Sequence, residues 1–343
     1  MALLLVASQL IPSRGWAGLA PWPVYWFFQP AQGALATGVW VIAHECGHGA
    51  FSKWQAVNDG VGLVLHSCLL VPYFSWKHSH RRHHSNTASL EKDEVFVPPT
   101  ASELADGWQQ TWFVRVTKLA VTLTIGWPCY LFLNVSGRKY ERPANHFDPY
   151  SPIFSKRERL EVLASDAALG LVLTGLGGLA RTFGWAWLLK VYVVPYLIVN
   201  AWLVTITLLQ HTHPALPHFA AGEWDWLRGA LSTVDRSYGF LDHMFHHIAD
   251  THVAHHLFSG MPHYHAREAT AVLKPLLGPY YQFDARSPGR ALLEDWLRCS
   301  YVSPDPTPDL KINSKSDHKI PLSGASGVFW YRSLPVGGVK KAK

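Results

Sequence analysis

Three short histidine clusters stand out in the sequence by their spacing. The first is HECGH, with imidazoles at His44 and His48, and the others are HRRHH and HVAHH, which end at His84 and His256. Residues three and four apart share one face of a helix, so each cluster can direct two or three imidazoles at one point. Neutral imidazole is a common metal ligand. The pattern therefore predicts a metal centre.

The number of imidazoles indicates more than one ion. One zinc ion takes about four ligands, so eight clustered imidazoles predict two metal ions. The identity of the metal stays open, because imidazole binds Zn, Cu, Fe and Ni alike. The eight candidates are His44, His48, His80, His83, His84, His252, His255 and His256. Other histidines lie off this spacing, and we interpret them as surface or hydrogen-bonding side chains: His78, His243, His246, His247, His263 and His265.

Three carboxylates lie close in sequence to the clusters. Asp93 and Glu94 follow the second cluster, and Asp250 precedes the third. A carboxylate that accepts a hydrogen bond from the outer nitrogen of a ligating histidine orients the ring and raises its basicity. These three residues are candidates for that role, with ordinary solvated charges as the alternative.

The composition indicates a membrane protein. Of the 343 residues 48% are hydrophobic and only 16% charged, whereas charged residues make up roughly a quarter of an average soluble domain. The net charge of +6 does not indicate nucleic-acid binding, because the basic residues form no recognisable module. They lie beside apolar runs, as in the loops that flank membrane spans.

The apolar segments have the lengths of membrane elements. Residues 24–43 carry no charge and match the roughly 20 residues needed to cross a bilayer. Residues 162–180 and 184–209 are long apolar stretches joined by a short turn around Arg181 and Thr182, as in a transmembrane hairpin. Two shorter segments, 61–76 and 119–135, are expected to be interfacial or re-entrant. We therefore expect an all-α integral membrane protein with about four transmembrane helices plus interfacial helices.

The rest of the chain is more polar. Residues from about 211 to 300 are expected to form a cytosolic helical cap that holds the histidine-ligated di-metal site, within a single domain covering 1–343. Positive charge is concentrated beside the second cluster and in the loops after it, which places the clusters on the cytosolic side. Residues 303–343 are expected to be a loose tail, because the segment begins with a run rich in Pro, Ser and charge.

The three clusters resemble the histidine boxes of the membrane fatty-acid desaturases. The segments around the clusters are similar to those of the plant and algal endoplasmic-reticulum oleate delta-12 (omega-6) desaturases. These segments are HSNTASLEKDEVFVP (84–98), LQHTHPALPH (209–218) and DTHVAHHLFSGMPHYHA (250–266). Glu45 favours that branch over the omega-3 members, which usually carry Asp there. The resemblance runs from about residue 24, and because family members usually begin well before Met1, we expect an N-terminally truncated sequence.

The resemblance implies a cofactor, partners and a location. It implies two iron ions held by the eight box histidines, with His211 as a further ligand in preference to His213. It also implies O2 as co-substrate, electrons from cytochrome b5 and its NADH-dependent reductase, and the oleoyl chain of a membrane phospholipid as substrate, converted to linoleoyl. Lys340 and Lys341 match a dilysine pattern for retrieval to the endoplasmic reticulum. In the chemistry that the resemblance implies, no side chain need act as nucleophile or general base.

Two alternatives remain open from the sequence. A fatty-acid hydroxylase, epoxygenase or conjugase would share the same boxes and scaffold. A histidine-rich membrane metal transporter is a more remote alternative, because its ligands would line a path within the spans, whereas these clusters lie at span ends and in polar segments.

Overall fold

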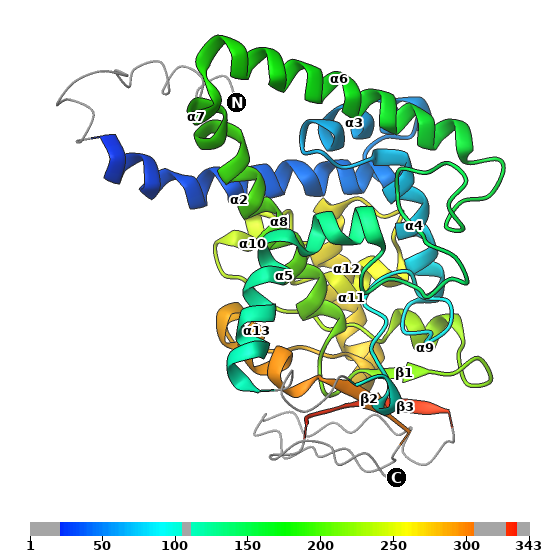
Figure 1. The fold of residues 1–343 in the computed structure, drawn as a ribbon. Coiled ribbons are helices and arrows are strands. Elements are labelled where there is room, and N and C mark those ends of the chain that lie inside the picture. Colours follow the sequence, from blue (N-terminus) through cyan, green and yellow to red (C-terminus); the bar gives the residue numbers. More distant parts are fainter. Residues whose placement is uncertain (1–20, 105–110, 305–326, 335–343) are drawn as a thin grey trace.

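The structure, a computed structural model, describes residues 21–104, 111–304 and 327–334. Helices dominate these ranges, and one small sheet completes them (Figure 1). The longer helices are α2 (Pro21–His48), α3 (Gln55–Cys68), α4 (Tyr73–Asn86), α5 (Trp112–Leu133), α6 (Arg159–Phe183), α8 (Val194–His211), α12 (His263–Leu277) and α13 (Pro288–Arg298).

Short elements connect these helices. The short helices are η2 (Ala101–Glu103), α7 (Trp185–Leu188), η4 (Leu189–Val193), α9 (Trp226–Ala230), α10 (Leu241–Met244), α11 (His252–Leu257) and η5 (Gly278–Tyr280). The strands are β1 (Pro217–Phe219), β2 (Tyr301–Ser303) and β3 (Val328–Arg332). β3 is the central strand and pairs antiparallel with both neighbours.

Helix α8 lies at the centre of the molecule. Figure 1 shows α2 and α6 running across the upper part, while α8 descends from α7 toward the smaller helices α9 to α13. Leu203 and Leu209 of α8 are buried in the main apolar cluster together with Val41 of α2 and Phe245. α8 is therefore positioned by packing on α2, and its last residue is His211.

Three stretches of the described chain are long and apolar enough to cross a membrane: α5, α6 and the continuous segment Trp185–His211. A fourth results if α3 and α4, which are bent by 107° at their junction, form one broken span. The expected fold class, an all-α membrane protein with about four spans, is thereby confirmed, with the three-stranded sheet as an addition.

The expected segments map onto these helices. Residues 24–43 lie inside α2, 162–180 inside α6, and 184–209 on α7, η4 and α8, while 61–76 includes the bend between α3 and α4. Residues 119–135 lie mostly in α5, which also has the length and apolarity of a span. The assignment of each segment to the membrane or its interface stays a prediction.

The turn of the predicted hairpin falls at Gly184. Helix α6 continues through Arg181 and Thr182 to Phe183, and Gly184 then adopts a φ of 89°. Glycine takes such positive φ values at little cost and commonly terminates helices. The turn therefore lies two to three residues beyond the position expected from the sequence.

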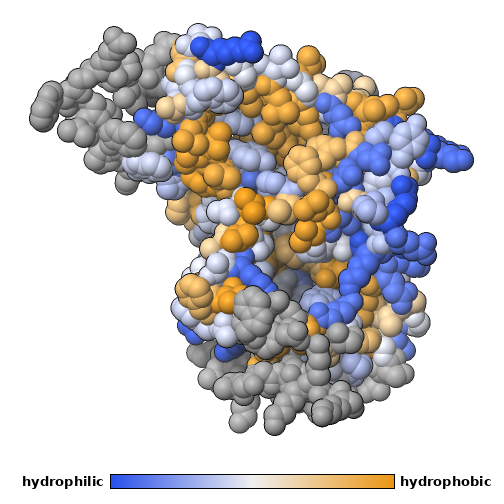
Figure 2. Space-filling model, viewed as in Figure 1, coloured by the Kyte–Doolittle hydropathy of each residue, from blue (hydrophilic) through white to orange (hydrophobic). Residues whose placement is uncertain are grey.

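The outer surface of α6 is apolar. Leu160, Leu163, Leu171 and Leu173 are exposed along this helix. Figure 2 shows apolar side chains over the upper part of the visible face and hydrophilic ones gathered toward one edge. Large exposed apolar surfaces mark sites of interaction with membranes or partners, and α6 has this character along its length.

The segment expected to be a loose tail contains a strand. Val328–Arg332 pairs through Trp330 with Pro217 and through Arg332 with Tyr301. Aromatic and β-branched residues favour strands, and VFWYR has both, which accounts for the ordered sheet at this point. The dilysine pattern at residues 340–341 lies outside the described residues.

Candidate metal centre

Four helices bring the histidine boxes together. The first box occupies the last turns of α2, the second lies along the second half of α4, and the third forms α11. His211 is the last residue of α8. The imidazoles therefore converge from segments far apart in the sequence, and the described part of the chain contains two groups that could hold a metal ion.

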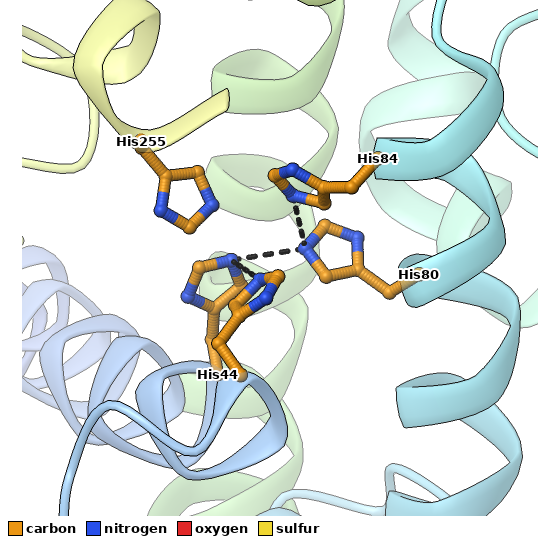
Figure 3. Close-up of side chains that lie close together, drawn as sticks. His44, His80, His84 and His255 are labelled. Carbon is orange, nitrogen blue, oxygen red and sulfur yellow. Dashed lines mark hydrogen bonds between the residues drawn. The ribbon is translucent and has the colours of Figure 1, made fainter. Parts of the chain in front are cut away.

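The first group contains five histidines. Their ring nitrogens lie within 4.8 Å of one another, and the members are His44, His48, His80, His84 and His255. The Nε2 atom of His44 lies 3.0 Å from Nε2 of His80 and 3.2 Å from Nε2 of His48. Figure 3 shows His44, His80, His84 and His255 directed toward a common point from α2, α4 and α11.

The second group lies next to the first. Ring nitrogens of His83, His211 and His256 lie within 4.8 Å of one another, and Nε2 of His83 lies 3.3 Å from Nε2 of His211. His252 adjoins this group, with its Nε2 3.2 Å from that of His211 and 3.1 Å from that of His256. The structure thus brings all nine sequence-predicted histidines together.

The histidines of the second and third boxes are distributed between the two groups in opposite ways. In α4 the pair His80 and His84 faces the first group and His83 the second, whereas in α11 the pair His252 and His256 faces the second group and His255 the first. Each helical residue is rotated by about 100° from the one before it, so residues i and i+4 share a direction while i+3 diverges from i+4. The same HxxHH spacing therefore supplies both groups from both helices.

Burial keeps the third-box imidazoles neutral. Loss of solvation, together with the neighbouring imidazoles, holds the pKa of His252 and of His256 well below the usual value. Burial likewise lowers the pKa of His255 to about 3. Neutral imidazoles present lone pairs, and metal ions bind the neutral ring.

The spacing of the nitrogens fits metal coordination. Two unprotonated ring nitrogens that face each other need a proton or a cation between them, because their lone pairs repel. Metal–nitrogen bonds of about 2.0–2.1 Å place adjacent ligands of one ion roughly 3 Å apart. The observed Nε2 separations are 3.0 to 3.3 Å, so the residues fit two ions bound by imidazole.

One of the three carboxylate candidates contacts a box histidine. Asp93 Oδ1 lies 2.7 Å from Nδ1 of His83, and its Oδ2 accepts the N–H of Ala88 at 2.8 Å. Glu94 instead accepts the hydroxyl of Tyr140 at 2.6 Å. The geometry therefore supports an orienting role for Asp93 and shows no such contact for Glu94.

Asp250 has a partner outside the nine histidines. Its two carboxylate oxygens lie 3.1 and 3.0 Å from Nδ1 of His247, a residue that we interpreted as a surface or hydrogen-bonding histidine. The sequence placed Asp250 two residues before His252, but the side chain points to the other side of the turn. Its contact therefore gives it no orienting role toward a box histidine.

Sequence reasoning missed Glu45 as a neighbour of the centre. Its Oε1 lies 3.4 Å from Nδ1 of His44, and its Oε2 accepts the backbone N–H of His263 at 2.9 Å. Glu45 is buried and links the first box to the start of α12. Adjacent residues on a helix do not normally face each other, so no spacing in the sequence signals this contact.

Other polar side chains near the second box contact carboxylates outside the nine histidines. Arg81 and Arg82 both donate to the carboxylate of Glu158, at 3.1 and 2.6 Å. His78 contacts Glu161, with Nε2 2.5 Å from Oε2. His213, which was the less favoured candidate for the ninth ligand, also has a partner elsewhere. Its Nε2 lies 3.6 Å from Asp284 Oδ2.

A cavity of about 470 Å³ extends along the centre. Its wall includes five of the nine histidines, namely His44, His80, His83, His211 and His252. Most of the remaining wall comes from α5, α8, α13 and the segment 95–104. Aromatic side chains stand next to the histidines, and Trp76 stacks on His80 with ring centroids 4.5 Å apart. The cavity therefore places aromatic side chains directly beside the metal centre.

Comparisons with known proteins agree with this arrangement. The profile of the family described as "Fatty acid desaturase" matches residues 20–286. A Delta(12)-acyl-lipid-desaturase of Punica granatum is 58% identical over 321 residues, which cover 91% of this chain and 77% of that protein. An omega-6 fatty acid desaturase of Glycine max, named as endoplasmic reticulum isozyme 2, is 57% identical over 90% of this chain and 77% of its own length. An oleoyl-12-hydroxylase of Ricinus communis, FAH12, is 52% identical over 91% of this chain and 76% of its own length.

Proposed function

The chain belongs to the fatty acid desaturase family, and we propose that it introduces a cis delta-12 double bond into oleoyl chains of membrane lipid, giving linoleoyl chains. One observation carries the proposal: two adjacent groups of imidazoles contribute to the wall of a cavity of about 470 Å³. The relatives named as delta-12 or omega-6 desaturases, at 57–58% identity, support the position of the double bond.

We propose that the two groups of histidines hold two iron ions. When bound, the irons supply the O2-dependent oxidation that an unactivated methylene requires and that side chains alone do not provide. The nine imidazoles fix the ions beside the cavity, and Asp93 fixes the ring of His83. Burial of the groups keeps water away from the site of oxidation.

The cavity wall determines which carbons reach the centre. A misplacement of about 1 Å can cost as much as a hundredfold in rate, so regioselectivity needs a wall that fixes the depth of the acyl chain. Trp40, Trp76 and Trp127 form an edge-to-face series beside the first group, with Trp40 centroids 5.3 and 6.3 Å from the other two. Rigid aromatic rings of this kind suit the task. The proposed chemistry needs no side chain as general base or nucleophile.

We further propose the remaining parts of the reaction system from the family resemblance. Cytochrome b5 and its NADH-dependent reductase return electrons to the irons, and a phospholipid carries the acyl chain. The protein resides in the endoplasmic reticulum membrane with its histidine boxes facing the cytosol. The isozyme names of two Glycine max relatives support the compartment.

Expression in yeast that makes no linoleate tests the proposal. Lipids extracted from cells producing the wild-type chain should contain linoleoyl chains, with oleoyl chains depleted in proportion. The variant His83→Ala should yield none, while His265→Ala, which alters an exposed histidine paired with Glu268, should match the wild type. Immunoblots confirm equal protein amounts. Unchanged product in His83→Ala would refute the ligand assignment.

A hydroxylase is the second candidate, because the 52% identical relative from Ricinus communis is named an oleoyl-12-hydroxylase. The same lipid profile separates the two outcomes, since a hydroxylated chain differs in mass and retention from linoleate. Ricinoleate, an epoxide or a conjugated product in place of linoleate would overturn the desaturase assignment. A metal transporter would give no oxygen-dependent lipid product.

A further inference from the structure

A pair of histidines outside the metal centre has the geometry of a second metal site. Nδ1 of His243 lies 3.2 Å from Nε2 of His247, and the ring centroids are 4.8 Å apart. His44 and His48 in the main centre have the same 3.2 Å nitrogen separation and the same i, i+4 spacing. We propose that His243 and His247 bind a transition-metal ion of the Zn²⁺, Cu²⁺ or Ni²⁺ class at a solvent-accessible site.

Asp250 prepares one of the two rings for an ion. Its carboxylate oxygens lie 3.1 and 3.0 Å from Nδ1 of His247, so this nitrogen carries the proton and donates it. The lone pair of the ring is then on Nε2, the atom that faces His243. A carboxylate behind a histidine, with the metal on the opposite nitrogen, is the usual arrangement at protein metal sites.

The backbone at this site is held in an uncommon conformation. His246 and His247 have φ values of 52° and 61°, a region that non-glycine residues rarely adopt. The turn is fixed by the N–H of His247, which donates to Asp242 O at 2.7 Å, and by the hydroxyl of Thr251, which donates to His247 O at 2.6 Å. This turn directs the His247 ring toward His243.

His246 supplies no third ligand. Its ring lies 4.9 Å from that of His263 and so points away from the pair. An ion at the pair would therefore have two imidazoles, and water would complete its coordination. Imidazole suits Zn²⁺, Cu²⁺ and Ni²⁺, whereas Mg²⁺ and Ca²⁺ prefer oxygen ligands.

Access distinguishes this site from the main centre. His243 is exposed, and the side chains of His247 and Asp250 are 15% and 19% exposed. An ion can thus enter and leave from solvent, and with two protein ligands it binds more weakly than an ion with four or five. Without an ion, the Nδ1–H of His243 can donate to Nε2 of His247, so the pair is satisfied in both states.

Calorimetric titration with Zn²⁺ tests the site on the full chain, purified in detergent with its iron bound. Wild-type protein should bind one more Zn²⁺ than His243→Ala or His247→Ala, with iron content unchanged in all three. Asp250→Asn should weaken this binding about 10- to 100-fold. His265→Ala, an exposed histidine beside Glu268, should bind like the wild type.

Two results would overturn the proposal. In the first, His243→Ala and His247→Ala bind Zn²⁺ with the wild-type stoichiometry and affinity. In the second, each Zn²⁺ bound releases one iron ion, which places the zinc in the main centre. The retained iron of the variants shows that they are folded, and the measurement does not depend on which lipid product the enzyme forms.

Discussion

The carboxylate of Asp93 lies 2.7 Å from Nδ1 of His83. The other ring nitrogen, Nε2, faces His211 of the second group. Asp93 also accepts the backbone N–H groups of Ala88 and Val95, at 2.8 and 3.1 Å. The carboxylate is therefore fixed by the turn that follows α4, and it holds the imidazole in one orientation and one tautomer. The outer nitrogen of His83 thus meets a carboxylate, whereas that of His256 meets the hydroxyl of Thr87 at 3.3 Å.

Replacing Asp93 by Asn should reduce iron binding and activity. The amide carries no charge, so it holds the Nδ1–H of His83 less strongly, and loss of such a partner typically costs about 10- to 100-fold in metal affinity or activity. Iron per chain and linoleate formed in yeast are the two measurements. Glu94→Gln is the matched control, because its side chain binds Tyr140 and no box histidine. Wild-type iron content and activity in Asp93→Asn would contradict the orienting role.

The sequence predicted which histidines meet, because i, i+3 and i+4 spacing on a helix is a local property. It could not predict that His83 and His84, which are adjacent, face different groups, since that depends on how α4 is rotated against α2 and α11. Proximity in sequence also did not predict the partner of Asp250, because its carboxylate contacts His247 and not a box histidine. Glu45 was overlooked because its partners come from two separate helices.

The same limit applies to the fold. The long apolar helices were predictable from composition and length, because burial in lipid demands both. β3 was not, since its pairing with β1 joins Phe329 to His218 across more than a hundred residues. A short strand is specified by its partners as much as by its own residues. The aromatic and β-branched residues of VFWYR favour a strand, but they do not identify its partners.

Replacing Arg236 by Met should destabilise the protein. The guanidinium is fully buried, with Nη1 2.6 Å from Asp284 Oδ2 and Nη2 3.3 Å from Asp295 Oδ2. Without Arg236, both carboxylates must share Arg286, whose Nη2 lies 2.6 Å from Asp284 Oδ2 and 2.7 Å from Asp295 Oδ1. Part of the buried negative charge then loses its compensation, and breaking a buried ion pair costs up to about 3–5 kcal/mol. The Tm of the purified protein should fall clearly. Arg290→Gln removes an exposed pair with Glu294 and should cost less than about 1 kcal/mol; equal Tm losses in the two variants would contradict the prediction.

Stability should depend on pH through Asp235. Burial raises the pKa of this carboxyl to about 7, although it accepts the hydroxyl of Tyr281 at 2.5 Å and the N–H of Val253 at 2.8 Å. In the unfolded chain the pKa is about 3.9, so the folded state binds more protons between these values, and stability falls as pH rises through this range. Relative to Asp235→Asn, which does not titrate, the wild-type Tm should decrease between about pH 5 and pH 8. Parallel Tm curves for the two proteins would show that Asp235 does not titrate in this window.

Narrowing the cavity at Gly126 should change the acyl chain that the enzyme accepts. Gly126 lies on the wall of the cavity in α5, and a Cβ added there would lie 3.0 Å from Thr122 Cγ2 and 3.7 Å from Val204 Cγ2. A leucine at this position must extend into the space that the substrate occupies, because neither neighbour leaves room beside it. Oleoyl conversion should fall at least about tenfold, since a displacement of about 1 Å is enough to misalign the reacting carbons.

The lipid profile of yeast distinguishes a change in substrate choice from a loss of folding. In Gly126→Leu the ratio of desaturated 16-carbon to 18-carbon chains should rise, because the shorter chain needs less of the cavity. Gly175→Leu is the control, since a Cβ at Gly175 in α6 meets no atom within 4 Å, and it should retain the wild-type ratio. If both variants lose activity equally with the ratio unchanged, the cavity wall at Gly126 does not position the substrate.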